Sequence, residues 1–207
     1  MEVIFLTAAA PAVDPRFQSL FLATSVIALV FQISATALIA VVSFIVSRAV
    51  RHGLFPYWAS GWACYTGSLL AVLFAFRISS IAPILFFAYF FLEYAAIVFI
   101  FAGCRHAATG LVPGRRVLYS LAPAAVVAAL LTGPPFVFLW RYTIHNGILG
   151  LAWFACLVAL WPAVRDRASG PGVRLTAVGL LLLALDYFEH CACRREFHPG
   201  PAVAASA

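Results

Sequence analysis

The stretch SIAPILFFAYFFLEYAAIVFIFA, from Ser80 to Ala102, decides the fold class. It carries one charged side chain, Glu93, and is otherwise almost entirely apolar or aromatic. About 20 such residues are enough for a helix to cross roughly 30 Å of hydrocarbon. Backbone N–H and C=O groups in lipid must pair within their own segment, so the stretch predicts a transmembrane helix.

Apolar segments of this kind recur along the whole chain. Of its 207 residues, 65% are hydrophobic and 10% are charged, whereas a soluble domain is about half apolar and about a quarter charged. Six segments are predicted to span: Phe17–Ser47, Phe55–Phe76, Ser80–Ala102, Val117–Leu131, Phe136–Trp161 and Val173–His190. We therefore predict an all-α, polytopic membrane helix bundle at residues 17–190. An exposed N-terminal segment at 1–16 would precede it, and a polar, flexible tail at 191–207 would follow.

Arginine placement predicts the orientation. All thirteen basic side chains are Arg, and eight lie in or beside the first, third and fifth connectors: Arg48, Arg51, Arg105, Arg115, Arg116, Arg165, Arg167 and Arg174. Loops rich in basic residues stay in the cytoplasm. We therefore expect a multi-pass membrane protein with its N-terminus outside. The fourth segment is short and contains Pro123; if it did not cross, everything downstream would be inverted.

The remaining composition excludes several function classes. The formal charge of +6 is spread over short loops, not gathered on a basic face with interleaved aromatics, so nucleic-acid binding is not expected. The chain has no HExxH, GxSxG, phosphate-binding loop or GxGxxG, and we expect no enzyme activity.

Polar side chains inside the predicted spans are costly, and they single out candidate site residues. Arg141, His145 and Asn146 lie near the outer end of the fifth span, and Asp186, Glu189 and His190 share a face near the outer end of the sixth. One interpretation is a structural ion pair between Arg141 and Asp186 or Glu189; another is a small outward-open pocket that binds a ligand or responds to pH. Transport is the third, but it would need polar groups through the whole depth. Glu93 is a separate buried carboxyl.

The last polar stretch contains His190, Cys191, Cys193 and His198. Two Cys and two His can hold zinc, but structural sites use CxxC or wider pairs so that both thiolates reach one ion. The CxC spacing argues against a metal site, and no cofactor is expected.

Two segments carry a resemblance to a known group of proteins. In FPYWASGWACYTGSLLAVLFAF (55–76), Trp58 and Trp62 follow a basic loop at i, i+4 spacing; FLEYAAIVFIFAGCRHAATG (91–110) leaves its helix through Arg105 and a Gly-bearing loop. The pattern resembles the N-terminal multi-helix sensor regions of bacterial diguanylate cyclases and sensor histidine kinases.

This resemblance implies a sensory module without its own catalytic domain. Its partners would be the lipid bilayer, a downstream or partner signalling domain, and possible homodimer contacts. Such modules usually add a seventh helix and an output domain, so the chain looks truncated before its last helix. Two other hypotheses stay open: a small transporter or channel subunit, and an intramembrane enzyme using Glu93, Asp186 and His190.

Overall fold

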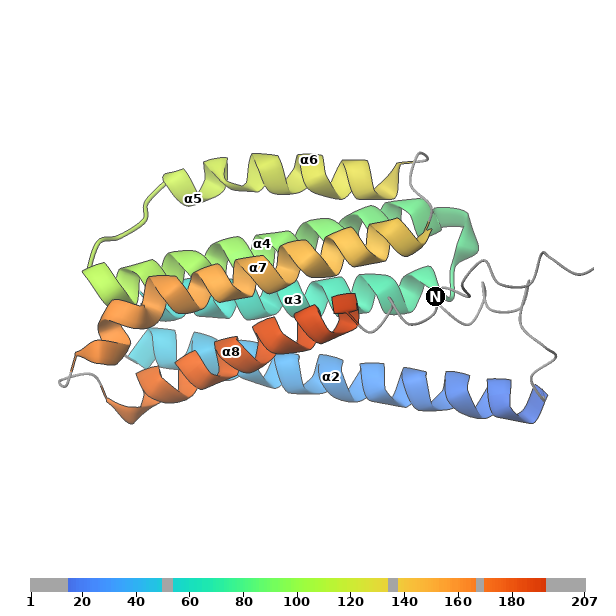
Figure 1. Cartoon of the computed structure of the whole chain (residues 1–207), viewed down its shortest axis with the longest axis horizontal. Coiled ribbons are helices and arrows are strands. Elements are labelled where there is room, and N and C mark those ends of the chain that lie inside the picture. Colours follow the sequence, from blue (N-terminus) through green and yellow to red (C-terminus); the bar gives the residue numbers. More distant parts are fainter. Residues whose placement is uncertain (1–14, 50–53, 134–137, 167–169, 193–207) are drawn as a thin grey trace, which may run out of the picture. The chain divides into compact units, whose positions relative to one another are not determined.

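The computed structural model describes residues 15–49, 54–133, 138–166 and 170–192 (Figure 1). Every regular element in these ranges is helical, which confirms the predicted all-α class. In chain order they are α2 (Pro15–Ala49), α3 (Leu54–Ala75), the 3₁₀ helix η2 (Ser79–Ile81), α4 (Ala82–Thr109), α5 (Arg116–Tyr119), α6 (Leu121–Thr132), α7 (Phe138–Arg165) and α8 (Pro171–Ala192). Most of the two predicted terminal segments lies outside the described residues.

Five of the described helices are long and apolar enough to cross a membrane. Their candidate spans are Thr24–Ala49, Phe55–Ala75, Ser79–Thr109, Arg141–Arg165 and Pro171–Glu189, and the apolar helix Arg116–Thr132 is shorter. The five long spans fall on five of the six predicted segments. The chain is therefore a multi-pass helix bundle of membrane character.

The short fourth segment is interrupted at Ser120, between α5 and α6. Pro123 explains the break, because it has no N–H to donate to the Tyr119 carbonyl and its ring would clash with that group. Ser120 N–H instead lies within hydrogen-bond distance of two carbonyls, 3.3 Å from Arg116 and 3.2 Å from Val117. The two helices together are about 25 Å long, a little less than the roughly 30 Å of hydrocarbon that a span must cross.

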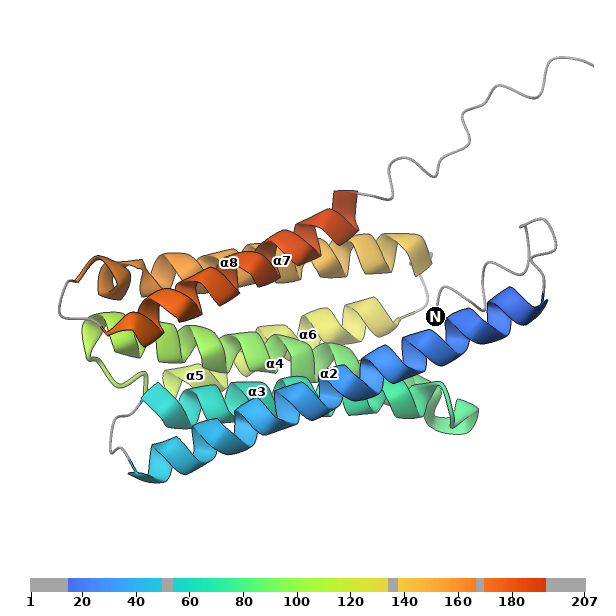
Figure 2. The ribbon, with the colours of Figure 1, turned by 90° about the horizontal axis from the view of Figure 1, so that it is seen from below.

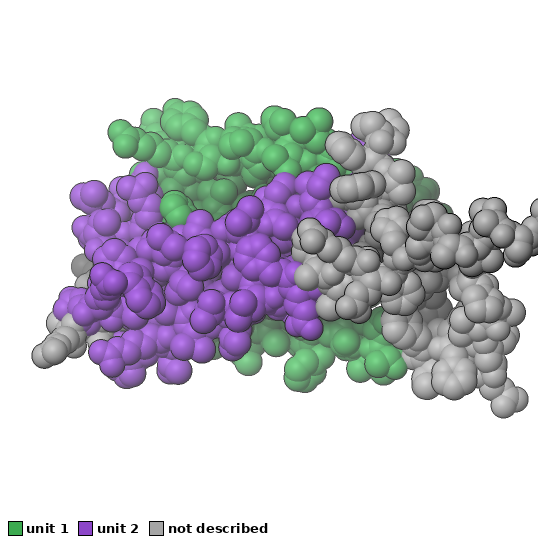
Figure 3. All heavy atoms as spheres, viewed as in Figure 1, with its two compact units in different colours: residues 1–103, 114–132 green, residues 104–113, 133–207 purple. Residues whose placement is uncertain are grey.

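The chain divides into two compact units, which are coloured separately in Figure 3. Unit 1 comprises residues 1–103 and 114–132, and unit 2 comprises 104–113 and 133–207. In unit 1, α2 packs along α3, and α3 approaches α4 closely at glycines. A Cβ on Gly61 would lie 2.6 Å from Ile100 Cγ1 and 3.0 Å from the Ala96 carbonyl oxygen. Small residues at membrane helix contacts let two backbones come this near.

Unit 2 begins with the last turns of α4 and is dominated by the antiparallel pair α7 and α8 (Figure 2). The helix α4 ends because Gly110 adopts a left-handed conformation with φ 69°. Its N–H donates to the His106 carbonyl at 2.8 Å, as in a helix C-cap built on a left-handed residue. Within the pair, Gly150 of α7 faces Phe188 of α8, whose ring would be 3.1 Å from an added Cβ.

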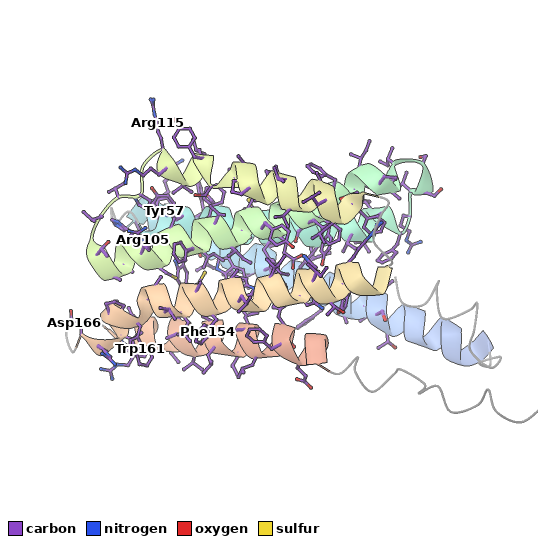
Figure 4. All side chains as sticks on the ribbon, turned by 45° about the horizontal axis from the view of Figure 1, so that its top comes forward. Tyr57, Arg105, Arg115, Phe154, Trp161 and Asp166 are labelled. Carbon is purple, nitrogen blue, oxygen red and sulfur yellow. The ribbon has the colours of Figure 1, made fainter. Side chains whose placement is uncertain are left out.

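In each unit, aromatic and basic side chains gather at one end. Figure 4 shows Tyr57 and Arg115 at one end of unit 1. It also shows Arg105 at the end of unit 2 that holds Trp161 and Asp166. The Trp161 ring is 45% exposed, and the Arg165 guanidinium lies 5.7 Å from its centroid. Indole beside Arg is the pairing expected at a membrane–water boundary.

Candidate functional site

Two interhelical hydrogen bonds join α2 to α3 in apolar surroundings. Gln32 Nε2 donates to the Tyr65 hydroxyl at 3.3 Å, and the Thr66 hydroxyl donates to the Thr36 hydroxyl at 3.0 Å. Thr36 in turn donates to the Ile33 carbonyl at 3.1 Å. Hydrogen bonds of this kind hold membrane helices together because lipid offers their polar groups no alternative partner.

Glu93 of α4 lies at the same level as these bonds. A Cβ on Gly67 would be 3.3 Å from Leu92, and Gly61 lies against Ala96 and Ile100. The two contacts give one register for the antiparallel helices α3 and α4, and that register sets Glu93 level with Thr66. Glu93 also shares a face of α4 with Ala96 and Ile100, at i+3 and i+7, so it lies on the side of α4 that meets α3.

We call the set Gln32, Thr36, Tyr65, Thr66 and Glu93 the central polar layer. Thr36, Thr66 and Glu93 are 6%, 9% and 2% exposed. Ser68, the remaining buried polar side chain described in unit 1, lies half a turn away and donates to the Tyr65 carbonyl at 2.7 Å. The buried Thr, Ser and Glu side chains described in unit 1 therefore all lie at one level.

The layer borders the apolar core of unit 1. Tyr65 packs with Leu69 and Ala96, against Leu29 and Ile33 of α2, and the Trp62 ring meets Tyr65 edge to face at 6.1 Å between centroids. A charge is expensive in such surroundings unless it is paired. A carboxyl held there can therefore couple its own pairing to the way the helices pack.

A second polar set lies on α7 in unit 2. His145 and Asn146 are 1% and 3% exposed, and Arg141 is half-buried. Arg141 Nη2 donates to the Gly133 carbonyl. Three buried donors on α7 have no hydrogen-bond acceptor among the described residues: Arg141 Nε, Asn146 Nδ2 and Trp153 Nε1. The structure thus brings three predicted site residues together on one stretch of α7.

The α8 residues of the predicted cluster do not lie level with Arg141. Asp186 and Glu189 are exposed, and the His190 side chain lies outside the described part of the chain. The contact between Gly150 and Phe188 fixes the α7–α8 register, and at 1.5 Å per residue it separates Arg141 and Glu189 by about 12 Å along the helices. Asp186 is farther still, so the register does not support the predicted ion pair. That all six residues form one functional cluster stays a prediction.

Within the described ranges, no group of three or more His, Cys, Asp or Glu side chains could hold a metal ion. Most of the predicted CxC stretch, including Cys193 and His198, lies outside those ranges. Cys104 and Cys156 are buried, Cys64 is half-buried, and all three are free. Burial of this kind is typical of Cys acting as a small apolar packing residue.

Of this layer, the sequence analysis singled out Glu93 but not Thr36, Tyr65 or Thr66. Depth matching would have found them. In an antiparallel hairpin, residues equally far from the connector lie at the same depth, and a connector centred near residue 50 pairs the low thirties with the mid-sixties. Matching the depths of α2 and α3 residues in this way needs the exact length of the connector, which hydropathy alone does not supply.

Comparison of the chain with protein-family models, curated proteins and solved structures finds no match. The resemblance to bacterial sensor regions therefore stays a prediction, and the chemistry of the two polar sets has to carry any functional argument.

Proposed function

We propose that the chain is a membrane-embedded sensory module of the bacterial inner membrane, with its N-terminus outside and no catalysis of its own. The observation that carries the proposal is the central polar layer, a buried carboxyl and hydrogen-bonded hydroxyls confined to one level of unit 1. A stimulus that changes the layer would shift α2, α3 and α4 against one another. A signalling domain, on a partner or farther along the protein, would receive that movement.

Confinement to one level favours signalling over transport. A transporter or channel needs polar groups at successive depths, so that an ion or solute always has a partner along its path. The buried Thr, Ser and Glu side chains described in unit 1 offer one site at a single depth instead of a path. One such site is sufficient for a switch, which only has to choose between two packings.

The hydrogen bonds of the layer also have an alternative arrangement. The Thr66 oxygen lies 3.0 Å from the Thr36 hydroxyl and 2.9 Å from the Trp62 carbonyl. A hydroxyl has one proton to donate, so Thr66 can bond across to α2 or back into its own helix. A small change at Glu93 could select between these states, which is how a local event biases a two-state element.

The polar set on α7 is the proposed input. In the proposed orientation the end of α7 that carries Arg141, His145 and Asn146 lies toward the outside. The unfilled donors at Arg141 Nε and Asn146 Nδ2 suit a ligand with acceptor oxygens. Asp186, Glu189 and His190 of the predicted cluster would lie toward the same side on α8.

The experiment compares conformational change with flux in proteoliposomes. The emission of Trp62 would be followed with the other Trp residues replaced by Phe, while external pH is stepped across roughly 5 to 8, and an enclosed dye would report proton entry. We expect a change in emission, lost in Glu93→Gln, without proton flux. The matched control Asp166→Asn, at an exposed carboxylate outside the predicted cluster, should respond like the parent protein.

Flux that disappears in Glu93→Gln would instead establish the alternative function, a small transporter or channel subunit. An emission that stays constant in both proteins, with folding verified by circular dichroism, would leave the layer as structural packing and contradict the sensory proposal.

A further inference from the structure

We propose that the groove between α2 and α3 at their shared loop end binds one anionic glycerophospholipid, with an acyl chain along the groove and the phosphate on Arg48. The groove lies entirely within unit 1 and has a volume of about 630 Å³. This site is distinct from the central polar layer and from the polar set on α7, and it does not depend on the proposed sensory function.

The groove exists because small side chains line it where α2 and α3 face each other. Ala59 and Ala63 of α3, at i and i+4, face Ala40 of α2, and all three line the groove. The apolar side chains of Val41 and Phe44 form the α2 wall and are 55% and 52% exposed. From residue 40 to residue 48 the wall extends about 12 Å along α2, a length that suits part of an acyl chain.

Among the residues that line the groove, the charged side chain is Arg48, at the loop end. The Arg48 guanidinium lies 5.1 Å from the centre of the Phe44 ring, so one of its faces is held against the wall. Within the described part of the chain, no hydrogen bond or ion pair to this guanidinium is seen. Its N–H edge is thus presented to an acceptor, and a guanidinium binds phosphate oxygens through two parallel hydrogen bonds.

The apolar walls select the occupant. A free phosphate would gain the Arg48 contact but would leave Val41 and Phe44 uncovered, whereas a zwitterionic lipid would bring a positive group beside Arg48. An anionic diacyl lipid satisfies both ends of the groove. Basic pockets between transmembrane helices at the cytoplasmic side recognise such lipids in this way.

Native mass spectrometry of the delipidated full chain tests the proposal. Phosphatidylglycerol and phosphatidylcholine with the same acyl chains would be titrated in parallel. We expect one phosphatidylglycerol to bind preferentially, and Arg48→Gln to weaken it about fivefold. Ala63→Leu, which fills the groove without altering charge, should weaken both lipids. Arg77→Gln, at an exposed Arg beyond the far end of α3, is the matched control and should bind like the parent protein.

Three outcomes would overturn the proposal. Equal binding of the two lipids would remove the role of charge, and parent-like binding by both Arg48→Gln and Ala63→Leu would place the lipid elsewhere. Displacement of the lipid by inorganic phosphate or glycerophosphoglycerol alone would show a headgroup site without an acyl groove. Circular dichroism and gel filtration of each variant would separate lost binding from misfolding.

Discussion

The hydroxyls of Thr36 and Thr66 meet at 3.0 Å between α2 and α3. Both side chains are buried. If one hydroxyl is removed, the other therefore has no water molecule to bond in its place. Replacing both with Val should therefore cost less than the sum of the two single replacements. We expect a coupling free energy of about 0.6–1.7 kcal/mol in a double-mutant cycle.

Thermal or denaturant unfolding in micelles would measure this coupling. Ser34→Ala is the matched control, because the exposed Ser34 hydroxyl bonds only within its helix, to the Val30 carbonyl at 2.9 Å. Additive Thr36→Val and Thr66→Val effects would contradict the bond.

Of the two glycines of unit 1 that face α4, Gly61 should tolerate replacement less well than Gly67. An added Cβ meets Ile100 and the Ala96 backbone, so Gly61→Ala must push α3 away from α4, at a cost of about 1–3 kcal/mol. Gly147→Ala is the control, since nothing lies within 4 Å of its Cβ position, and it should be neutral or stabilising. Unfolding of the two variants under one condition checks the contrast, and equal stabilities would refute the α3–α4 contact.

Gly150 and Phe188 fix how α7 and α8 are aligned. Gly150→Ala should destabilise unit 2, because its Cβ would be 3.1 Å from the Phe188 ring. Phe188→Leu should relieve that effect in the double variant. Failure of this rescue, measured by unfolding, would show that the Gly150 side of α7 does not face Phe188.

The same alignment predicts that Arg141 and Glu189 act independently. At about 12 Å apart along the helices, the replacements Arg141→Gln and Glu189→Gln should add to within about 0.5 kcal/mol in the free energy of unfolding. A coupling of 1 kcal/mol or more would restore the ion pair that the sequence suggested.

Single-cysteine labelling in intact cells decides whether α5 and α6 cross the membrane. With the native Cys residues replaced, Ser79→Cys and Gly133→Cys should react with an impermeant reagent from the same side, and Leu111→Cys from the other. Labelling of positions 111 and 133 from one side would mean that the segment Arg116–Thr132 does not span, and the orientation of α7 and α8 would be reversed.

Hydropathy was sufficient to predict most of the helical architecture, because the long apolar runs leave no other way to satisfy the backbone in lipid. The break at Ser120 follows from Pro123, which the sequence already displayed. The site was harder to predict. One interpretation paired Arg141 with a carboxylate because neighbouring helices carried opposite charges. The Gly150–Phe188 register does not favour that pair, and Arg141 donates to the Gly133 carbonyl.

Glu93 was also difficult to interpret from the sequence. Its isolation in the sequence suggested a lone carboxyl, whereas Gly61 and Gly67 align α4 so that it joins Thr66 and Thr36. Whether residues of two helices lie at the same depth depends on how the helices are aligned. That alignment is set by close contacts between the helices, and the hydropathy pattern of one helix does not reveal it.

The helices of unit 1 differ strongly in length, and the bilayer has to absorb that difference. The 35 residues of α2 extend about 52 Å, while α5 and α6 together extend about 25 Å. If α5 and α6 span the membrane, lipids beside them must thin, whereas α2 must tilt or project from the surface. Hydrophobic mismatch would then be uneven around the circumference of unit 1, and a change in membrane thickness would act more strongly on one side of it than on the other.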